Sequence, residues 1–270
     1  MIEILPSRAI ALSIAGFPIH WYGIMYLLGF LITAFLLPRL QRYRGMHEHK
    51  DDWLNLVTWA VVGVIAGGRL GYVLFYQPAY YLRNPLEILY VWEGGMSFHG
   101  GLIGVSTLLF LYCRKRGWNI RTVGDIVVVP VAIGLALGRL GNFINLELYG
   151  SVTSLPWAIA IPGVEGLRHP TQLYAMGKDL LIAAVCFLYL VRTWQRGQWL
   201  DGRAAALFLM LYGVGRFLNE FLRVQTASPL IIGPLELTRG QLLTIPVFIA
   251  GVAVWFWSRQ LTAVPARESA

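Results

Sequence analysis

The sequence predicts an all-α integral membrane protein with about seven transmembrane helices, folded as a single polytopic membrane domain over residues 1–270. Two observations on composition point to this class: 57% of the residues are hydrophobic and only 13% are charged. Such a chain is largely dissolved in lipid. The third observation is a series of apolar stretches of about 20 residues, the length that crosses a bilayer. No linker or low-complexity segment divides the chain.

The seven apolar stretches are expected near residues 18–38, 53–76, 96–113, 122–141, 171–191, 204–222 and 240–258. The first opens with His20-Trp21-Tyr22-Gly23, whose aromatic rings suit the membrane interface. The second and fourth each end in Gly-Arg-Leu-Gly, and the third opens near His99. The fifth follows His169-Pro170-Thr171, a pattern typical of a helix start. The sixth carries Tyr212-Gly213-Val214-Gly215-Arg216.

An odd number of spans places the termini on opposite sides of the membrane, and the basic residues between spans decide the orientation. One set of connections contains thirteen of them: Arg39, Arg42, Arg44, Lys50, Arg114, Lys115, Arg116, Arg121, Arg192, Arg196, Arg203, Arg259 and Arg267. The other set contains five: Arg8, Arg83, Arg168, Arg223 and Arg239. We therefore predict an N-terminus on the outer side of the membrane, periplasmic if the membrane is a bacterial inner membrane, and a cytoplasmic C-terminus. The start Met1-Ile2-Glu3-Ile4 lacks the basic region of a cleaved signal peptide, so the first span is expected to remain.

The formal net charge of +8 does not indicate a nucleic acid partner, because the basic residues are divided among short connections and form no continuous stripe. The two cysteines, Cys113 and Cys186, are expected at different depths in the membrane. They are therefore predicted to be buried thiols that neither pair with one another nor act as nucleophiles.

Four cationic residues fall inside the spans, and the predicted topology places all of them in outer halves together with His99: Arg69, Arg139, Lys178 and Arg216. Ionisable side chains at such depth are costly and usually functional. Arginine offers a rigid donor fork for phosphate or carboxylate, and neighbouring glycines allow close approach. The pattern predicts an anionic ligand held at membrane depth. Two structural explanations stay open, since arginines near span ends can snorkel to headgroups and His99 alone can pack between helices.

The segment Gly141-Asn142-Phe143-Ile144-Asn145-Leu146-Glu147-Leu148-Tyr149-Gly150 adds two amides and a carboxylate close to Arg139. Its glycines predict a tight, ordered re-entrant or interfacial turn. Glu147 either belongs to the site or only neutralises Arg139.

On the sixth span Tyr212, Arg216 and Glu220 are spaced by four residues and share one helical face. Arg223 follows Glu220 by three residues and can share its carboxylate. These side chains form either an interhelical ion-pair network or a set that aims Arg216 at a ligand.

Taken in order, these motifs resemble those of bacterial prolipoprotein diacylglyceryl transferases. The resemblance runs from about residue 18 to residue 258 and shows no departure at the motif positions. The motifs that carry it are His99-Gly100-Gly101-Leu102-Ile103-Gly104, Gly138-Arg139-Leu140-Gly141-Asn142-Phe143-Ile144-Asn145, Glu147 with Gly150, His169-Pro170-Thr171-Gln172-Leu173-Tyr174, and Tyr212-Gly213 with Arg216, Glu220 and Arg223.

The resemblance implies transfer of a diacylglyceryl group from phosphatidylglycerol to the lipobox cysteine thiol of prolipoproteins. This reaction forms a thioether, releases glycerol phosphate and is the first step of bacterial lipoprotein maturation. The resemblance also implies a multi-pass protein of the bacterial inner membrane with its active site toward the periplasm. By position, the expected catalytic residues are His99, Arg139 and Arg216. The expected substrate-binding residues are Tyr22, Arg69, Asn142, Glu147, Gly150, Tyr212 and Glu220.

The physical chemistry of the residues fits this reaction. Cleavage of the bond between glycerol carbon and phosphate oxygen builds negative charge on the phosphate, which the guanidinium groups of Arg139 and Arg216 oppose. A thiol with a pKa of about 8.5 is mostly protonated at neutral pH, so a base or a positive field must help to form the thiolate. His99 is the candidate base, and the arginine field is the alternative. Glu147 and Glu220 are expected to orient the arginines, and Asn142 and Tyr22 to bond the headgroup.

Other classes fit the sequence less well. Transporters commonly contain paired half-repeats with broken helices, which we do not find. An intramembrane hydrolase needs a His-Glu-x-x-His or Gly-x-Ser-x-Gly motif, and neither occurs. A metal-dependent phosphotransferase needs clustered aspartates, whereas Asp125, Asp179 and Asp201 are scattered. We therefore expect no metal and no cofactor.

Overall fold

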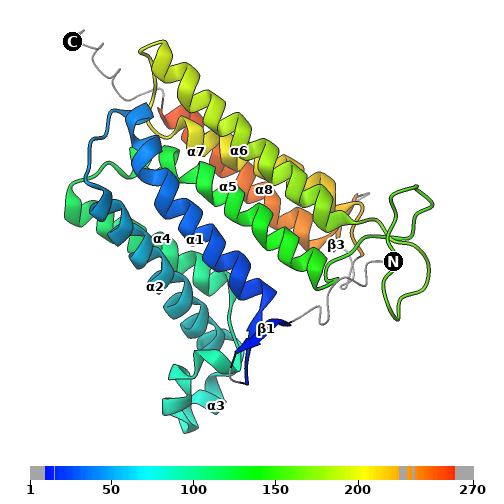
Figure 1. Cartoon of the computed structure of the whole chain (residues 1–270). Helices are drawn as coiled ribbons and strands as arrows, with labels where there is room; N and C mark the ends of the chain where they lie inside the picture. The colour runs from blue at the N-terminus through cyan, green and yellow to red at the C-terminus, as the bar shows by residue number, and fades with distance from the viewer. Residues whose placement is uncertain (1–9, 15, 225–229, 233–234, 259–270) are drawn as a thin grey trace. The chain divides into compact units, whose positions relative to one another are not determined.

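The computed structural model describes residues 10–14, 16–224, 230–232 and 235–258. Within these residues the chain is largely helical, with two short antiparallel hairpins (Figure 1). The start of the chain, predicted to be uncleaved, lies outside the described residues. Three of the basic residues used to predict the topology also lie outside them: Arg8, Arg259 and Arg267.

Each predicted apolar stretch corresponds to one long helix. These helices are α1 (Trp21–Leu40), α2 (Lys50–Phe75), α4 (Phe98–Arg116), α5 (Ile120–Ile144), α6 (Thr171–Gln195), α7 (Arg203–Glu220) and α8 (Arg239–Trp257). Five of them, α1, α2, α5, α6 and α8, are long and apolar enough to cross a membrane, whereas α4 and α7 fall short of that combination. The prediction of a helical integral membrane protein is therefore confirmed, with five helices that meet the length and composition of a membrane span.

Several short elements were not predicted. The connection between α2 and α4 contains the helix α3 (Pro78–Arg83) and the 3-10 turns η2 (Pro85–Leu89) and η3 (Val91–Glu93), and another 3-10 turn, η1 (Gln41–Arg44), follows α1. Strand β1 (Ile10–Ile14) pairs with β2 (Phe17–His20), and β3 (Leu230–Ile232) pairs with β4 (Leu235–Leu237). A search for stretches of membrane-spanning length overlooks elements of three to six residues.

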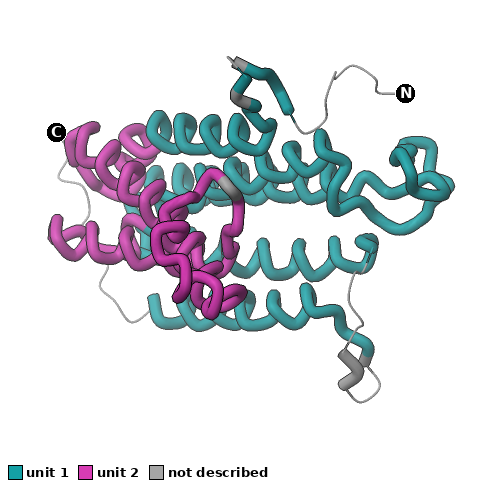
Figure 2. The backbone as a smooth tube through the Cα atoms, turned by 90° about the horizontal axis from the view of Figure 1, so that it is seen from below, with its two compact units in different colours: residues 1–36, 124–270 teal, residues 37–123 magenta. Residues whose placement is uncertain are grey.

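The described chain divides into two compact units (Figure 2). The larger unit comprises residues 1–36 and 124–270, and the smaller unit comprises residues 37–123. The larger unit contains most of α1 and α5 together with α6, α7 and α8, and the smaller unit contains α2, α3 and α4.

In the smaller unit, α2 and α4 pack backbone against backbone through glycines. A Cβ atom on Gly71 would lie 2.7 Å from Cα of Gly100, and one on Gly104 would lie 2.8 Å from Cα of Gly67. Gly63 completes the row on α2, at the same four-residue spacing. Helix association in lipid lacks a hydrophobic driving force and depends on such close packing between small residues. The glycines therefore hold these two helices together.

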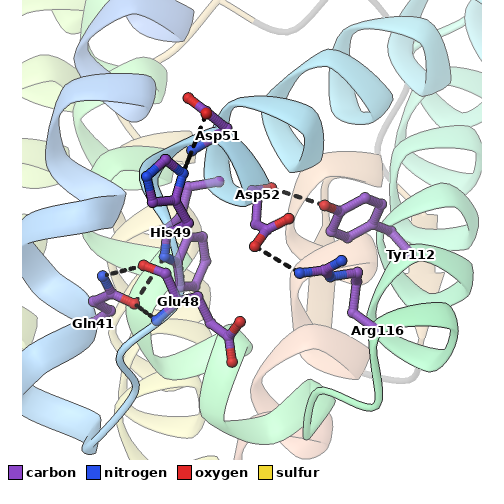
Figure 3. A network of polar contacts seen from close by, with 8 residues as sticks. Gln41, Glu48, His49, Asp51, Asp52, Tyr112 and Arg116 are labelled. Carbon is purple, nitrogen blue, oxygen red and sulfur yellow. Dashed lines mark hydrogen bonds and ion pairs between the residues drawn. The ribbon is translucent and has the colours of Figure 1, made fainter.

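Polar contacts join the start of α2 to the end of α4 in the same unit (Figure 3). Arg116 Nη2 lies 2.6 Å from Asp52 Oδ2, and the Tyr112 hydroxyl donates to the Asp52 carbonyl at 2.9 Å. Gln41 Oε1 accepts from the Glu48 N–H at 2.9 Å and so ties η1 to the residues before α2. These contacts fix the register of the glycine-packed pair at one end.

In the larger unit, α6, α7 and α8 lie side by side (Figure 1). Gly251 of α8 lies against α7, where a Cβ atom would be 2.9 Å from the backbone nitrogen of Met210. The buried Asp125 of α5 accepts from the Ala205 N–H of α7 at 2.9 Å. Cys186 of this unit and Cys113 of the smaller unit are buried free cysteines, as predicted.

Candidate active site

A small pocket of the larger unit, which we call the arginine pocket, brings cationic side chains from separate segments together. Arg139 comes from α5, Arg216 from α7 and Arg223 from the turn after α7. Its other lining residues are Leu148, Thr171, Gln172, Ala175 and Asn219. Three of the lining residues are thus cationic and none is anionic, which is the charge pattern of a site for an anion.

Glu220 balances part of this positive charge. Its Oε2 pairs with Nη1 of Arg216 one turn earlier on α7 and lies 3.8 Å from Nη1 of Arg223. Burial lowers the pKa of Arg223, and the Glu220 carboxylate opposes that shift. Arg139 forms no hydrogen bond or ion pair with any residue that the structure describes. Its donor fork is therefore available to a ligand.

The start of α8 holds the Glu220 carboxylate in place. Glu220 is only 3% exposed, and a Cβ atom on Gly240 would lie 2.6 Å from its Cδ. Thr238 and Gln241 form a capping box at this helix start, whose positive dipole end favours a nearby carboxylate. The sequence analysis missed Gly240, because its partner lies twenty residues earlier in the chain and no motif connects them.

A second group of polar side chains surrounds Glu147. Asn142 Nδ2 donates to the Tyr22 hydroxyl at the start of α1 and lies 3.5 Å from Glu147 Oε2. Asn145 Nδ2 donates to Glu147 Oε1 at 3.2 Å. Among the described residues no ion pair forms between Glu147 and Arg139, so the explanation of Glu147 as a simple counter-ion is not supported. The carboxylate is instead held by amides.

The backbone around Glu147 adopts a strained turn. Leu146 and Leu148 have φ of 56° and 57° and are the positive-φ residues other than glycine in the described chain. Bulky side chains rarely adopt this conformation. From α6, Gln172 Nε2 donates to the Glu147 carbonyl at 2.6 Å and Thr171 Oγ1 donates to the Leu148 carbonyl at 2.9 Å. The predicted ordered turn after the fourth apolar stretch is therefore present, and α6 supports it.

Gly150 lies where three segments cross. Its N–H donates to the His169 carbonyl at 2.9 Å, and it forms an isolated β-bridge with Arg223. A Cβ atom at this position would lie 2.6 Å from the Leu222 carbonyl oxygen and 2.7 Å from Cγ2 of Thr171. The crossing requires glycine, and it connects the Glu147 turn to the segment that carries Arg223.

Tyr212 does not line the arginine pocket. Its ring stacks on Phe208 at 5.8 Å, and Lys178 Nζ lies 4.4 Å from its centroid. Lys178 also pairs with Asp179, and its methylene groups lie against Gly215 of α7. The intramembrane cation Lys178 is thus neutralised locally.

Arg69 belongs to the smaller unit and holds a loop. Its guanidinium and Nε donate to the carbonyls of Glu87 at 2.5 Å, Ile88 at 2.9 Å and Gly94 at 2.6 Å. The side chain is 4% exposed and lies over the Tyr81 ring. Carbonyl groups therefore occupy the donors that sequence analysis assigned to substrate.

Replacement of Arg69 by methionine is expected to loosen the segment 85–95. The carbonyls of Glu87, Ile88 and Gly94 would lose their donor, and a hydrogen bond to a charged group contributes about 1.5–3 kcal/mol. Amide hydrogen exchange of this segment should therefore become at least about 30-fold faster. Arg83→Met, a change at an exposed position of the neighbouring helix α3, is the control. Equal exchange in both variants would contradict the role of Arg69 as a loop clamp.

His99 is exposed in the first turn of α4, also in the smaller unit. Ser97 caps this helix by accepting from the Gly100 N–H at 3.2 Å, and the Ser97 N–H donates to the carbonyl of Gly68 at 2.8 Å. The start of α4 is thus attached to the residue that precedes Arg69. The first turn of a helix leaves N–H groups unpaired and carries the positive end of the helix dipole.

Comparisons with known proteins agree over most of the chain. A family model described as prolipoprotein diacylglyceryl transferase matches residues 9–257. The chain is 45% identical over 253 residues to a phosphatidylglycerol--prolipoprotein diacylglyceryl transferase of Bordetella parapertussis, covering 92% of this chain and 94% of that protein. Proteins with the same name from Polynucleobacter asymbioticus and Legionella pneumophila are 45% and 41% identical, over 90% and 93% of this chain and 92% and 96% of their own lengths.

Proposed function

The chain belongs to the prolipoprotein diacylglyceryl transferase family, and from this premise we propose that it transfers a diacylglyceryl group from phosphatidylglycerol to a cysteine thiol of prolipoproteins. The observation that carries the proposal is the arginine pocket. Its three guanidinium groups suit the phosphate of an anionic lipid, and the donors of Arg139 have no partner among the residues that the structure describes. The chain is a multi-pass membrane protein, with five helices long and apolar enough to cross a bilayer: α1, α2, α5, α6 and α8. It therefore lies in the same membrane as its lipid substrate.

In the proposed reaction the cysteine sulfur attacks the diacylglycerol carbon that carries the phosphate. A carbon–sulfur bond forms, the carbon–oxygen bond breaks, and its electron pair leaves with glycerol phosphate. Arg139 and Arg216 bind the phosphate and oppose the charge that grows on its oxygen. Glu220 positions Arg216, with which it pairs directly. Loss of the thiol proton, to a base or under the positive field, produces the attacking thiolate.

The polar group around Glu147 is assigned to the lipid headgroup. Tyr22 and Asn142, which contact one another, bond the headgroup, while Glu147 anchors the amide of Asn142. Gly150 contributes by allowing the crossing of segments beneath this turn. Arg69 acts indirectly, by holding the loop before α4. Tyr212 also acts indirectly, because its ring packs against Lys178.

We further propose that all seven long helices span the bacterial inner membrane and that the two units form one membrane domain. The distribution of basic residues supports a periplasmic N-terminus, a cytoplasmic C-terminus and a site in the outer half of the membrane. The protein partner is the signal peptide of a prolipoprotein, with its lipobox cysteine. Labelling of cysteines placed at the exposed positions Arg83 and Arg196 in intact spheroplasts tests this orientation, which requires that Arg83→Cys react with an impermeant reagent and that Arg196→Cys not react.

Substitution of His99 by glutamine distinguishes its two possible contributions. If His99 is the base, the variant should transfer about 10²-fold more slowly or worse, and the pH profile of kcat/KM should change shape. His47→Gln, at an exposed position of a loop in the same unit, is the matched control. A His99→Gln enzyme with the rate and pH profile of the unmodified enzyme would assign thiolate formation to the arginine field.

The proposed function is tested by incubating the purified protein with phosphatidylglycerol and a lipobox peptide and measuring the mass of the peptide. A diacylglyceryl adduct on the cysteine is expected, and none on a peptide with serine in its place. No adduct, together with movement of phosphatidylglycerol across liposome membranes, would identify a transporter instead. Activity lost in a chelator and restored by Mg²⁺ would contradict the assignment of the chemistry to side chains.

A further inference from the structure

Gln172 lines the arginine pocket, and its buried amide has an acceptor oxygen with no partner among the described residues. Gln172 is 2% exposed, and its Nε2 donates to the Glu147 carbonyl at 2.6 Å. Turning the amide around would place two oxygen atoms against one another, so this bond fixes the position of Oε1. Oε1 is buried and has no hydrogen-bond partner among the described residues.

The surroundings of this acceptor are otherwise rich in donors. Arg139, Arg216 and Arg223 line the same pocket as Gln172. Thr171 next to it already donates to the Leu148 carbonyl. A buried acceptor without a donor is unfavourable, so a ligand that fills the pocket must bring a hydrogen-bond donor as well as an anionic group. The donor has to be neutral, since an ammonium group would be repelled by the three guanidinium groups.

We propose that Gln172 Oε1 accepts a hydrogen bond from a hydroxyl of the glycerol headgroup while the arginines bind the adjacent phosphate. Gln172 is then a residue that determines specificity for the headgroup. This inference rests on the proposed function, because it names the part of phosphatidylglycerol that the same pocket recognises. The Glu147 turn satisfies only the Nε2 group of the buried Gln172, and the headgroup hydroxyl would supply the partner that Oε1 lacks among the described residues.

The test compares two lipid donors with the full-length protein and a lipobox peptide. The first is phosphatidylglycerol, and the second is phosphatidylpropanol, which has the same phosphate and a three-carbon headgroup without hydroxyls. The unmodified enzyme should prefer phosphatidylglycerol by about 10-fold or more in kcat/KM. In Gln172→Met this preference should fall to within about twofold, because only the hydroxyl-bearing lipid loses a contact.

Two further variants separate recognition from support of the turn. Gln172→Glu retains an acceptor oxygen but loses the donor to Glu147, so its rates should fall while its preference for phosphatidylglycerol is kept. Gln195→Met, the same change at the exposed end of α6, should keep both the rates and the preference.

Several results would overturn the inference. One is an equal loss of rate with both lipids in Gln172→Met, which would reduce Gln172 to a support for the turn. Another is an unmodified enzyme that does not distinguish the lipids, a result that needs no variant to fold. If the unmodified enzyme forms no adduct with phosphatidylglycerol at all, the proposed function itself fails. Transfer with an unchanged preference in Gln172→Met overturns this inference alone.

Discussion

Replacing Arg216 by alanine is expected to lower diacylglyceryl transfer by about 10³-fold. Removal of one donor that stabilises a developing oxyanion costs about 10²–10³ in rate in other enzymes. Arg216 supplies a guanidinium fork with two donor nitrogens, and its loss also removes the direct ion pair with the buried Glu220. Arg139→Ala should act in the same direction. The measurement is adduct formation per amount of protein inserted in the membrane.

Two comparisons separate charge from geometry at this position. Arg216→Lys keeps the charge but not the fork, so it should recover only a small part of the lost rate. Arg192→Ala removes a cation from the exposed end of α6 and should leave transfer unchanged. Phosphate binding by the arginine pocket would be refuted if Arg216→Ala and Arg139→Ala, both normally inserted, transferred as fast as the unmodified enzyme.

Substitution of Gly104 by leucine is expected to separate α2 from α4. A Cβ atom alone would lie 2.8 Å from Cα of Gly67, so a four-carbon side chain forces the helices apart. Overpacking of this kind costs about 1–3 kcal/mol for extra methylenes in a core that can adjust, and here the opposing atoms are backbone. We expect a loss of several degrees in melting temperature and poor accumulation in the membrane.

The matched control is Gly177→Leu. Gly177 lies in α6 with open space around the position of a Cβ atom, so the same change in hydrophobicity and helix propensity meets no obstacle. Its melting temperature should stay close to that of the unmodified protein. Equal behaviour of the two leucine variants would mean that the glycine contacts between α2 and α4 contribute little to stability.

The elements that could be predicted from sequence are those whose signal is local. A run of about 20 apolar residues indicates by itself a helix that lies in lipid, so each long helix of the structure was predicted. The spacing of Arg216 and Glu220 on one helix likewise predicted their contact, which the structure contains. The start of α6 at Thr171 follows from the proline before it.

The features that could not be predicted depend on partners far apart in the chain. Nothing in the sequence around Arg69 indicates that its donors meet carbonyls of residues 87–95. The contact of Gly240 with Glu220 depends on the packing of α8 against α7, and the Gln172 oxygen that has no partner among the described residues is buried only in the folded chain. The hairpins and short helices are too brief to produce a periodic pattern.

The left-handed backbone at Leu146 and Leu148 lowers the stability of the fold but positions a residue of the proposed site. A left-handed backbone costs a residue with a side chain roughly 1–2 kcal/mol, and two such residues enclose Glu147. Glycine at either position would relieve that energy, yet it would also free the loop that presents the carboxylate. Selection of this protein for survival at high temperature alone should therefore tend to erase these leucines, whereas selection for lipid transfer should retain them.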